Sequence, residues 1–146
     1  METTTDPAQD QTTGSPELTY SVKDFGATGT GDVTETDAIQ KTIDACHANG
    51  GGTVLLPPGR YLSGTIYLKS NVDFHLAAAA TLVASPDKND YNADNAFPEN
   101  RDIAHENVSA AHLIVCYRQD NVAISGRGTI HGNSEAFYEP LPEGKE

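Results

Sequence analysis

Three arginines in the second half of the chain have the chemistry to bind an anionic ligand. They are Arg101, Arg118 and Arg127, and the preceding arginine is Arg60. A guanidinium is planar and permanently charged, and it binds a carboxylate through two parallel hydrogen bonds. We therefore treat Arg101, Arg118 and Arg127 as candidate binding residues, with a plain surface charge or a loop clamp as the alternative for each.

The histidines and carboxylates form no pattern typical of catalysis or of metal binding. His131 and Gly132 make a His-Gly pair, but no pair of carboxylates accompanies it. His75 and His112 fall in or beside predicted strands without metal-ligand spacing, which favours structural roles. We expect no catalytic residue, no metal ligand and no cofactor site in this chain.

Acidic residues gather in a polar stretch after the middle of the chain. Calcium prefers several oxygen ligands, but the glycine-centred spacing of a calcium-binding loop is absent, so we expect a solvated acidic loop. Two aromatic residues of this stretch could stack on a sugar ring or anchor the loop. The acidic residues are Asp87, Asp90, Asp94, Glu99, Asp102 and Glu106, and the aromatic residues are Tyr91 and Phe97.

Composition and charge exclude several classes of partner. The 146 residues carry a formal net charge of −12, whereas binding to nucleic acid or to an anionic membrane requires a basic surface. We see neither an apolar run long enough to span a membrane nor a signal peptide, so the localisation stays open. Cys46 and Cys116 each lie in an apolar run, which predicts two buried free thiols, although a bridge between them is not excluded.

A ladder of very short strands lies between Gly50 and Ser85. Short runs of β-formers (TVLL, RYL, TIYL, VDFHL, ATLV) alternate with turn residues, and no space remains between them for a helix. Two-residue Asn-Gly or Asp-Gly hairpin turns are absent, so the ladder favours the coils of a solenoid over a hairpin sheet. Further strands are predicted at 112–117, 121–125 and 128–131.

One helix is predicted immediately before the ladder. Ile39, Ile43 and Cys46 recur at helical spacing, which indicates a helix over about 35–48 that ends at the glycines of 50–52. Thr34 and Asp37 approximate an N-terminal capping box. A first strand over 18–27 and a flexible glycine-rich turn precede the helix, whose expected role is to cover the open end of the solenoid.

The sequence repeats itself weakly. The pair Asn71-Val72 recurs as Asn121-Val122. The pair Thr81-Leu82 recurs as Thr129-Ile130, with nearly the same separation in the sequence. We interpret this echo as two turns of a coil of about 20 to 30 residues, with each asparagine at a structural corner. The predicted organisation is a disordered tail over 1–17, the first strand and capping helix over 18–49, coils over 50–133 with a long polar loop at 86–107, and an irregular tail over 134–146.

The motifs Phe-Gly-Ala, Asp-Ala-Ile-Gln, Gly-Gly-Gly-Thr-Val, Pro-Pro-Gly-x-Tyr and Leu-Lys-Ser-Asn-Val resemble those of pectin-degrading enzymes. Over 20–133 the chain is similar to the N-terminal part of glycoside hydrolase family 28, the polygalacturonases and their relatives. The resemblance implies an all-β fold, a right-handed parallel β-helix with one N-terminal capping α-helix. It also implies inverting hydrolysis of an acidic plant cell-wall polysaccharide, in which Arg101, Arg118 or Arg127 would serve an outer subsite.

The catalytic motifs of that family are missing here. The sequence contains no Asn-Thr-Asp, Asp-Asp, Gly-His-Gly or Arg-Ile-Lys, and inverting hydrolysis needs a carboxylic acid and a carboxylate on opposite sides of the sugar. We expect an N-terminal portion of a longer hydrolase that is inactive alone. The alternatives are a fragment of a β-eliminating lyase and a non-enzymatic β-helix module such as an adhesin, and we expect self-association through the exposed edge of the last coil.

Overall fold

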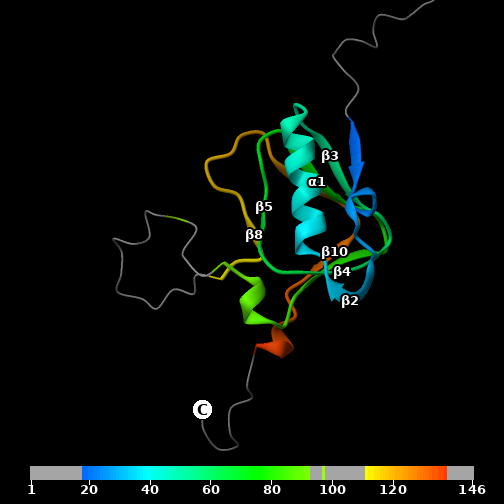
Figure 1. Ribbon diagram of the computed structural model, residues 1–146, viewed down its shortest axis with the longest axis vertical. Helices are drawn as coiled ribbons and strands as arrows, with labels where there is room; N and C mark the ends of the chain where they lie inside the picture. The colour runs from blue at the N-terminus through cyan, green and yellow to red at the C-terminus, as the bar shows by residue number, and fades with distance from the viewer. Residues whose placement is uncertain (1–17, 93–96, 98–110, 138–146) are drawn as a thin grey trace, which may run out of the picture.

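The computed structural model describes residues 18–92, 97 and 111–137 (Figure 1). The predicted tail over 1–17, and most of the loop at 86–107 and of the tail at 134–146, lie outside these residues. Short 3-10 helices cover Val22–Phe25, Lys88–Asp90 and Ser134–Ala136. The strands and the α-helix are β1 (Thr19–Ser21), β2 (Thr30–Thr34), α1 (Thr36–Ala48), β3 (Gly52–Leu56), β4 (Gly59–Ser63), β5 (Ile66–Tyr67), β6 (Val72–Leu76), β7 (Ala80–Ala84), β8 (Ile114–Val115), β9 (Ala123–Gly126) and β10 (Thr129–His131).

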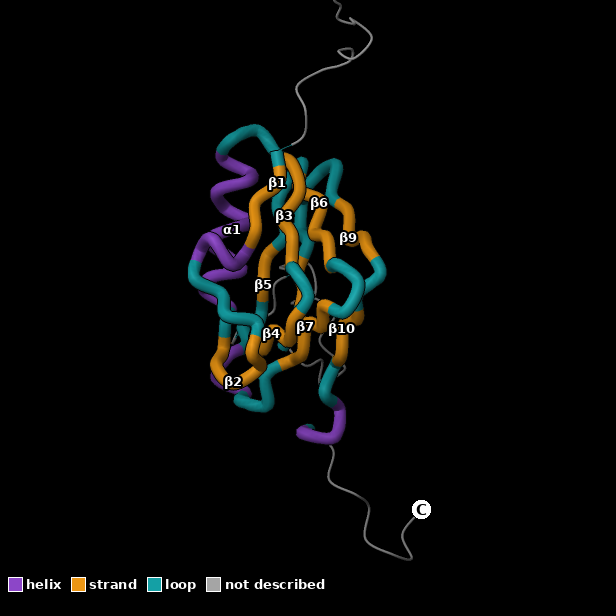
Figure 2. The backbone as a smooth tube through the Cα atoms, turned by 90° about the vertical axis from the view of Figure 1, so that its right-hand side faces the viewer, coloured by secondary structure: helices purple, strands orange, loops and turns teal. Residues whose placement is uncertain are grey.

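The strands pair in parallel and form three sheets. The first sheet has the order β1-β3-β6-β9, the second has the order β10-β7-β4-β2, and the third pairs β5 with β8. Figure 2 shows β1, β3, β6 and β9 side by side, with β4, β7 and β10 in a neighbouring row. Successive strands of the chain belong to different sheets, so each passage through the sheets makes one coil. The described residues are stacked parallel sheets with one α-helix, the arrangement of a partial β-helix.

The core consists of apolar side chains stacked from coil to coil. Val54 on β3, Phe74 on β6 and Ile124 on β9 occupy equivalent positions in the register, and Val54 and Phe74 are completely buried. Residues on either side of Phe74 point outward because side chains alternate along a strand. The pattern VDFHL therefore encodes a strand with one buried face and one polar face.

The repeat in the sequence corresponds to a single turn of the coil, which corrects our interpretation of it as two turns. Asp73 pairs with Ala123 and Thr81 pairs with Thr129, so both offsets of the repeat are registers of adjacent strands. By contrast, Gly52 pairs with Val72, which lies much closer to it in the sequence. The third coil is longer because the connection between β7 and β8 contains the polar stretch.

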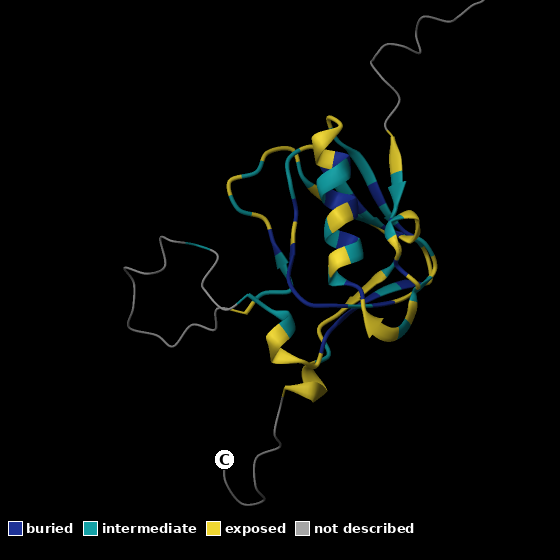
Figure 3. Ribbon diagram, viewed as in Figure 1, coloured by how far each residue is buried: buried dark blue, intermediate teal, exposed yellow. Residues whose placement is uncertain are grey.

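Helix α1 agrees with its predicted position within one residue. Its buried residues are Ile39, Thr42, Ile43 and Cys46, and this face packs against β1, β3 and β5, whereas the opposite face is exposed (Figure 3). The amides of Gly50 and Gly51 donate to the carbonyls of His47 and Cys46, the paired pattern that ends many helices. The described residues include no helix of the length and apolar character that a membrane crossing requires.

The start of the helix differs from the prediction. No side chain caps it, and the N-cap residue is Glu35, so the capping box of Thr34 and Asp37 does not form. The Glu35 carboxylate instead accepts hydrogen bonds from the amides of Thr28 and Gly29. The preceding loop thus satisfies this buried side chain, and the loop is fixed to the helix.

Three further local predictions were wrong. The first strand covers only Thr19–Ser21, since Val22–Phe25 form a 3-10 turn, and the supposed flexible turn contains β2. Cys46 is buried as expected, but Cys116 is exposed. Cys116 lies directly after the end of β8, next to the buried Val115.

Candidate functional site

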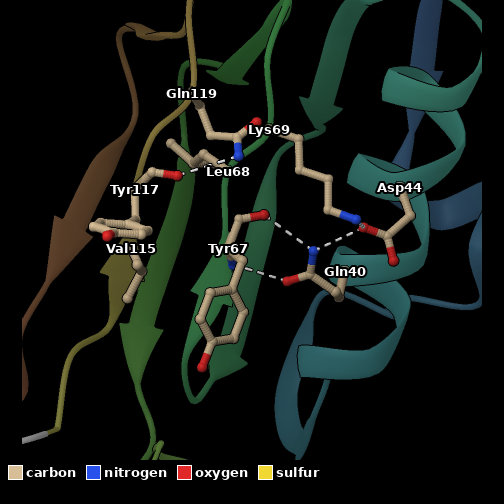
Figure 4. A pocket seen from close by; sticks show the side chains of 8 residues that line it. All are labelled: Gln40, Asp44, Tyr67, Leu68, Lys69, Val115, Tyr117 and Gln119. Atoms are coloured by element: carbon tan, nitrogen blue, oxygen red, sulfur yellow. Dashed lines mark hydrogen bonds and ion pairs between the residues drawn. The ribbon is translucent and has the colours of Figure 1, made fainter. Parts of the chain in front are cut away.

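A groove of about 490 Å³ lies between α1 and the edge of the third sheet. Figure 4 shows residues of α1 on one side and residues of β5, β8 and the segments that follow them on the other. The groove is open to solvent and mixes aromatic, amide and charged side chains, a composition suited to a polar ring-shaped ligand. The lining residues are Gln40, Asp44, Tyr67, Leu68, Lys69, Val115, Tyr117 and Gln119.

Gln40 fixes the distance between the two walls. Its Oε1 accepts a hydrogen bond from the backbone amide of Tyr67 at 2.8 Å, and its Nε2 donates to the carbonyl of the same residue at 3.0 Å. Nε2 also donates to Asp44 Oδ1, one helical turn further on, at 3.0 Å. The amide of Gln40 thus pairs with β5 as a neighbouring strand would, so it closes an otherwise free strand edge.

An ion pair lies at one end of the groove. Lys69 Nζ is 2.8 Å from Asp44 Oδ1, with the side chains 37% and 47% exposed, respectively. Partial burial opposes ionisation of Asp44, but the Lys69 ammonium, the Gln40 amide and the charge of His47 together lower the pKa of this carboxyl. Lys69 therefore reaches an incoming anion only if that anion competes with Asp44.

The second amide of the groove is also engaged with the backbone. Gln119 Oε1 accepts hydrogen bonds from the amide and hydroxyl of Ser70 at 2.9 and 3.0 Å, and its Nε2 donates to the carbonyl of Tyr117 at 3.2 Å. The Tyr67 side chain is free to face a ligand, since this residue is 42% exposed. The Arg118 guanidinium lies over the Tyr117 ring, 5.1 Å from its centroid.

This arrangement can bind a sugar, but it does not contain the groups for hydrolysis. Tyrosine rings pack against the apolar face of a sugar, and a lysine attracts a carboxylate. Asp44 is the one carboxylate among the described lining residues, whereas inverting hydrolysis uses two.

The three candidate arginines lie at different places relative to the groove. Arg118 lies beside the groove through its contact with Tyr117. Arg127 is exposed in the turn between β9 and β10 and is not among the residues that line the groove. Arg101 lies outside the described residues.

The histidines have separate local environments. His75 Nδ1 is 2.7 Å from Ser125 Oγ, which donates to Asp73 Oδ1 at 2.6 Å. Because the single hydroxyl proton goes to the carboxylate, Nδ1 of His75 must carry a proton to make its bond. The carboxylate therefore contacts the serine rather than the imidazole, unlike the order of a nucleophilic triad. No group of three metal-ligating side chains occurs in the described part of the chain.

His112 and His131 differ in the hydrogen bonds of their ring nitrogens. His112 is in edge-to-face contact with Phe97, and its buried Nδ1 has no hydrogen-bond partner in the described structure. His131 is exposed, and its Nδ1 accepts from the amide of Asn133 at 3.0 Å.

The described part of the acidic stretch is tied to the coils. Asp87 accepts from the amide of Asn89, and Asp90 accepts from the hydroxyls of Ser85 and Thr34. The Tyr91 hydroxyl donates to the carbonyl of Ser85 at 2.6 Å. The other acidic residues of the stretch, Asp94, Glu99, Asp102 and Glu106, lie outside the described residues.

Sequence reasoning missed the groove, because the repeat gives the wrong alignment for its wall. Extended toward the N-terminus, the offset between Asn71 and Asn121 would align Tyr67 with Tyr117, whereas β5 and β8 pair Tyr67 with Val115. Gln40 had no sequence signal, because its partner is 27 residues away on a different kind of element.

A family model described as rhamnogalacturonase A/epimerase, pectate lyase-like, matches residues 19–132. Among curated proteins, alginate lyase 7 of Azotobacter vinelandii is 51% identical over 63 residues, which are 38% of this chain and 7% of that protein. An exo-poly-alpha-D-galacturonosidase of Dickeya chrysanthemi is 32% identical over 130 residues, 84% of this chain and 20% of that protein. The chain thus spans a small part of the length of these relatives.

The fold is also found in a solved enzyme structure. The family 28 exopolygalacturonase of Yersinia enterocolitica superposes with a TM-score of 0.69 at 32% identity, covering 83% of this chain and 22% of that one. The similarity covers most of the chain described above.

Proposed function

The chain belongs to the rhamnogalacturonase A/epimerase, pectate lyase-like family, and on that premise we propose that it forms the N-terminal coils of a right-handed parallel β-helix enzyme that acts on a uronic-acid polysaccharide. The family is carbohydrate-active, and its relatives here act on alginate or on polygalacturonate by name. Both polymers carry a carboxylate on each sugar, so a shared recognition chemistry is reasonable.

We assign the groove between α1 and the third sheet to an outer subsite of this polysaccharide. The observation that carries the proposal is the combination of Tyr67, Tyr117 and Lys69 around one groove. Tyr67 offers a ring surface, since it is 42% exposed, and Lys69 can exchange Asp44 for a sugar carboxylate because this ion pair is partly exposed. Arg118, stacked on Tyr117, provides a second positive charge.

The reaction of the longer enzyme has more than one candidate chemistry. Similarity over 84% of the chain favours polygalacturonate hydrolysis, whereas the higher identity over shorter segments is shared by an alginate lyase and by mannuronan C5-epimerases. For the hydrolytic route the 146-residue chain alone is expected to bind without turnover, because the Asn-Thr-Asp and Asp-Asp motifs of family 28 are absent from it.

Titration of the isotope-labelled 146-residue chain with oligogalacturonate and with oligomannuronate tests this assignment by NMR. We expect weak binding, with shift changes at Tyr67, Lys69 and Tyr117, and a loss of most of the affinity in Tyr67→Ala. Lys41→Ala is a matched control, because Lys41 is exposed on α1 but does not line the groove. Shift changes confined to other surfaces would contradict the subsite.

Two product assays test the absence of turnover. Release of reducing ends would show that the chain contains a hydrolytic site, and an unsaturated product that absorbs in the ultraviolet would show a β-eliminating one. We expect neither product from either polymer.

Neutral oligosaccharides provide a separate test of how the groove recognises its ligand. If they bind as tightly as the uronates, recognition through carboxylates is contradicted.

A further inference from the structure

An ammonium and a carboxylate face each other at one end of the groove between α1 and the third sheet. Lys69 follows β5, Asp44 lies on α1, and Lys69 Nζ is 2.8 Å from Asp44 Oδ1 (Figure 4). Lys69 and Asp44 are the one cation and the one anion among the described residues that line the groove. The charge that would attract a sugar carboxylate is therefore already paired with a carboxylate of the chain itself.

Gln40 holds Asp44 at this position independently of Lys69. Gln40 Nε2 donates to Asp44 Oδ1 at 3.0 Å, and the same side-chain amide is bonded to the N–H and C=O of Tyr67. The carboxylate is thus fixed by its own helix and by β5 before any ligand arrives. A preorganised partner loses little conformational freedom when it pairs, so Asp44 competes effectively for the Lys69 ammonium.

Asp44 competes as an anion at neutral pH. Burial raises the pKa of its carboxyl, but the Lys69 ammonium, the Gln40 amide and the charge of His47 together outweigh burial and lower this pKa. The Lys69 and Asp44 side chains are nevertheless 37% and 47% exposed, and ion pairs so accessible to water add little to stability. A second anion can therefore displace Asp44 from Lys69.

We propose that Asp44 is an internal competitor of the ligand, so that a uronate sugar binds in the groove only by taking the place of Asp44 on Lys69. The proposal rests on the assignment of the groove to a uronate subsite and adds what limits the affinity of that subsite. Asp44 selects against anions in particular, since a sugar without a carboxylate does not compete for Lys69.

Asp44→Asn tests the proposal because it removes the charge and retains a carbonyl that can accept from Gln40. In calorimetric titration with oligogalacturonate, this variant should bind about twofold to fivefold more tightly than the wild type, the range that corresponds to an exposed ion pair. Its affinity for a neutral oligosaccharide should not change. Asp37→Asn is the matched control with the same change of charge, because Asp37 is exposed on the same helix and does not line the groove.

The dependence of affinity on salt separates competition from a merely structural role of Asp44. In the wild type, uronate binding exchanges one partner of Lys69 for another, so the charges of the lining side chains cancel before the ligand arrives. In Asp44→Asn the ligand meets an unpaired ammonium, and salt screens that attraction. We expect the affinity of Asp44→Asn for oligogalacturonate to fall more steeply with salt than that of the wild type or of Asp37→Asn.

Carbon-13 NMR of the Asp44 carboxyl provides a measurement on the unaltered chain. Its signal should move when oligogalacturonate saturates the groove, since Asp44 then loses Lys69, and it should stay in place with a neutral oligosaccharide.

The outcomes distinguish this proposal from the assignment of the groove. If the wild type binds oligogalacturonate but Asp44→Asn binds it no more tightly, or if the Asp44 signal does not move, competition by Asp44 is overturned and the subsite stands. If neither the wild type nor Asp44→Asn binds uronates at any salt concentration, both are overturned.

Discussion

Glu35 is a carboxylate at a buried position, only 4% exposed. It accepts hydrogen bonds from the Thr28 amide, the Thr28 hydroxyl and the Gly29 amide. Its role is to hold the loop before β2 against the start of α1. Charge-assisted bonds of this kind are stronger than neutral ones.

Glu35→Ala should lower the free energy of unfolding by about 1.5–3 kcal/mol, the net value of hydrogen bonds to a charged group. Urea denaturation measures the difference. Asp32→Ala, an exposed carboxylate in β2, is the control and should change stability by less than about 0.5 kcal/mol. Equal effects of the two changes would mean that the loop is not fixed by Glu35.

The two thiols should react differently with a thiol reagent. Burial raises the pKa of the Cys46 thiol, which keeps it protonated and unreactive, whereas Cys116 is exposed. We expect one thiol per molecule to be modified in the native protein and two in denaturant. In Cys116→Ser the fast native reaction should disappear; if it persists, Cys46 is accessible.

At the scale of elements, the side chain of Gln40 hydrogen-bonds to β5 as the backbone of a neighbouring strand would. The Gln40 side chain gives β5 an acceptor for its N–H and a donor for its C=O, and so the helix protects the sheet edge that it covers. Another side-chain contact joins neighbouring coils, since Asn121 Nδ2 donates to Asn71 Oδ1 at 3.1 Å. Both asparagines have positive φ angles, 68° at Asn71 and 57° at Asn121, which asparagine tolerates better than most residues.

Gln40→Ala should lower the free energy of unfolding by about 0.5–1.5 kcal/mol, the usual net value of a hydrogen bond. It should also speed hydrogen exchange of the Tyr67 amide in particular, which global destabilisation alone would not do. Lys41→Ala, on the exposed face of α1, should leave that amide unchanged. An unaltered Tyr67 amide in Gln40→Ala would show that solvent or another group replaces the glutamine.

At the scale of the whole molecule, stability depends on how many coils lie on each side of a core residue. Phe74 has Val54 on one side and Ile124 on the other, so its ring is enclosed. Ile124 has a neighbouring coil on one side only among the described residues. The same stack therefore contains an enclosed position and a terminal one.

Phe74→Ala should lower the free energy of unfolding by about 3–5 kcal/mol, since it combines lost burial with a cavity. Ile124→Ala in the same stack should cost considerably less, because this residue is 49% exposed. Thermal unfolding at a concentration where the protein is monomeric compares the two. Similar losses would mean that the last coil is as tightly packed as the middle one.

The sequence by itself determined the features that depend on near neighbours. Strands at TVLL, VDFHL and ATLV, and the helix ending before Gly50, agree with the structure because side-chain alternation, helical spacing and turn residues act within a few positions. The offset between Asn71 and Asn121 was already a correct register between strands, since it is the offset at which β6 pairs with β9. The sequence alone did not show how many turns of the coil this offset spans.

Only the tertiary structure decided the features that depend on contacts distant in the chain. It showed that the offset between Asn71 and Asn121 is one coil with a long connection, that Glu35 faces a loop rather than capping its helix, and that Cys116 is exposed. It also brought Gln40 to Tyr67 across 27 residues and placed Lys69 beside Asp44 to form the groove. The physical reason is that a solenoid fixes each side chain through the coils above and below it, and local spacing does not encode which residues those coils contribute.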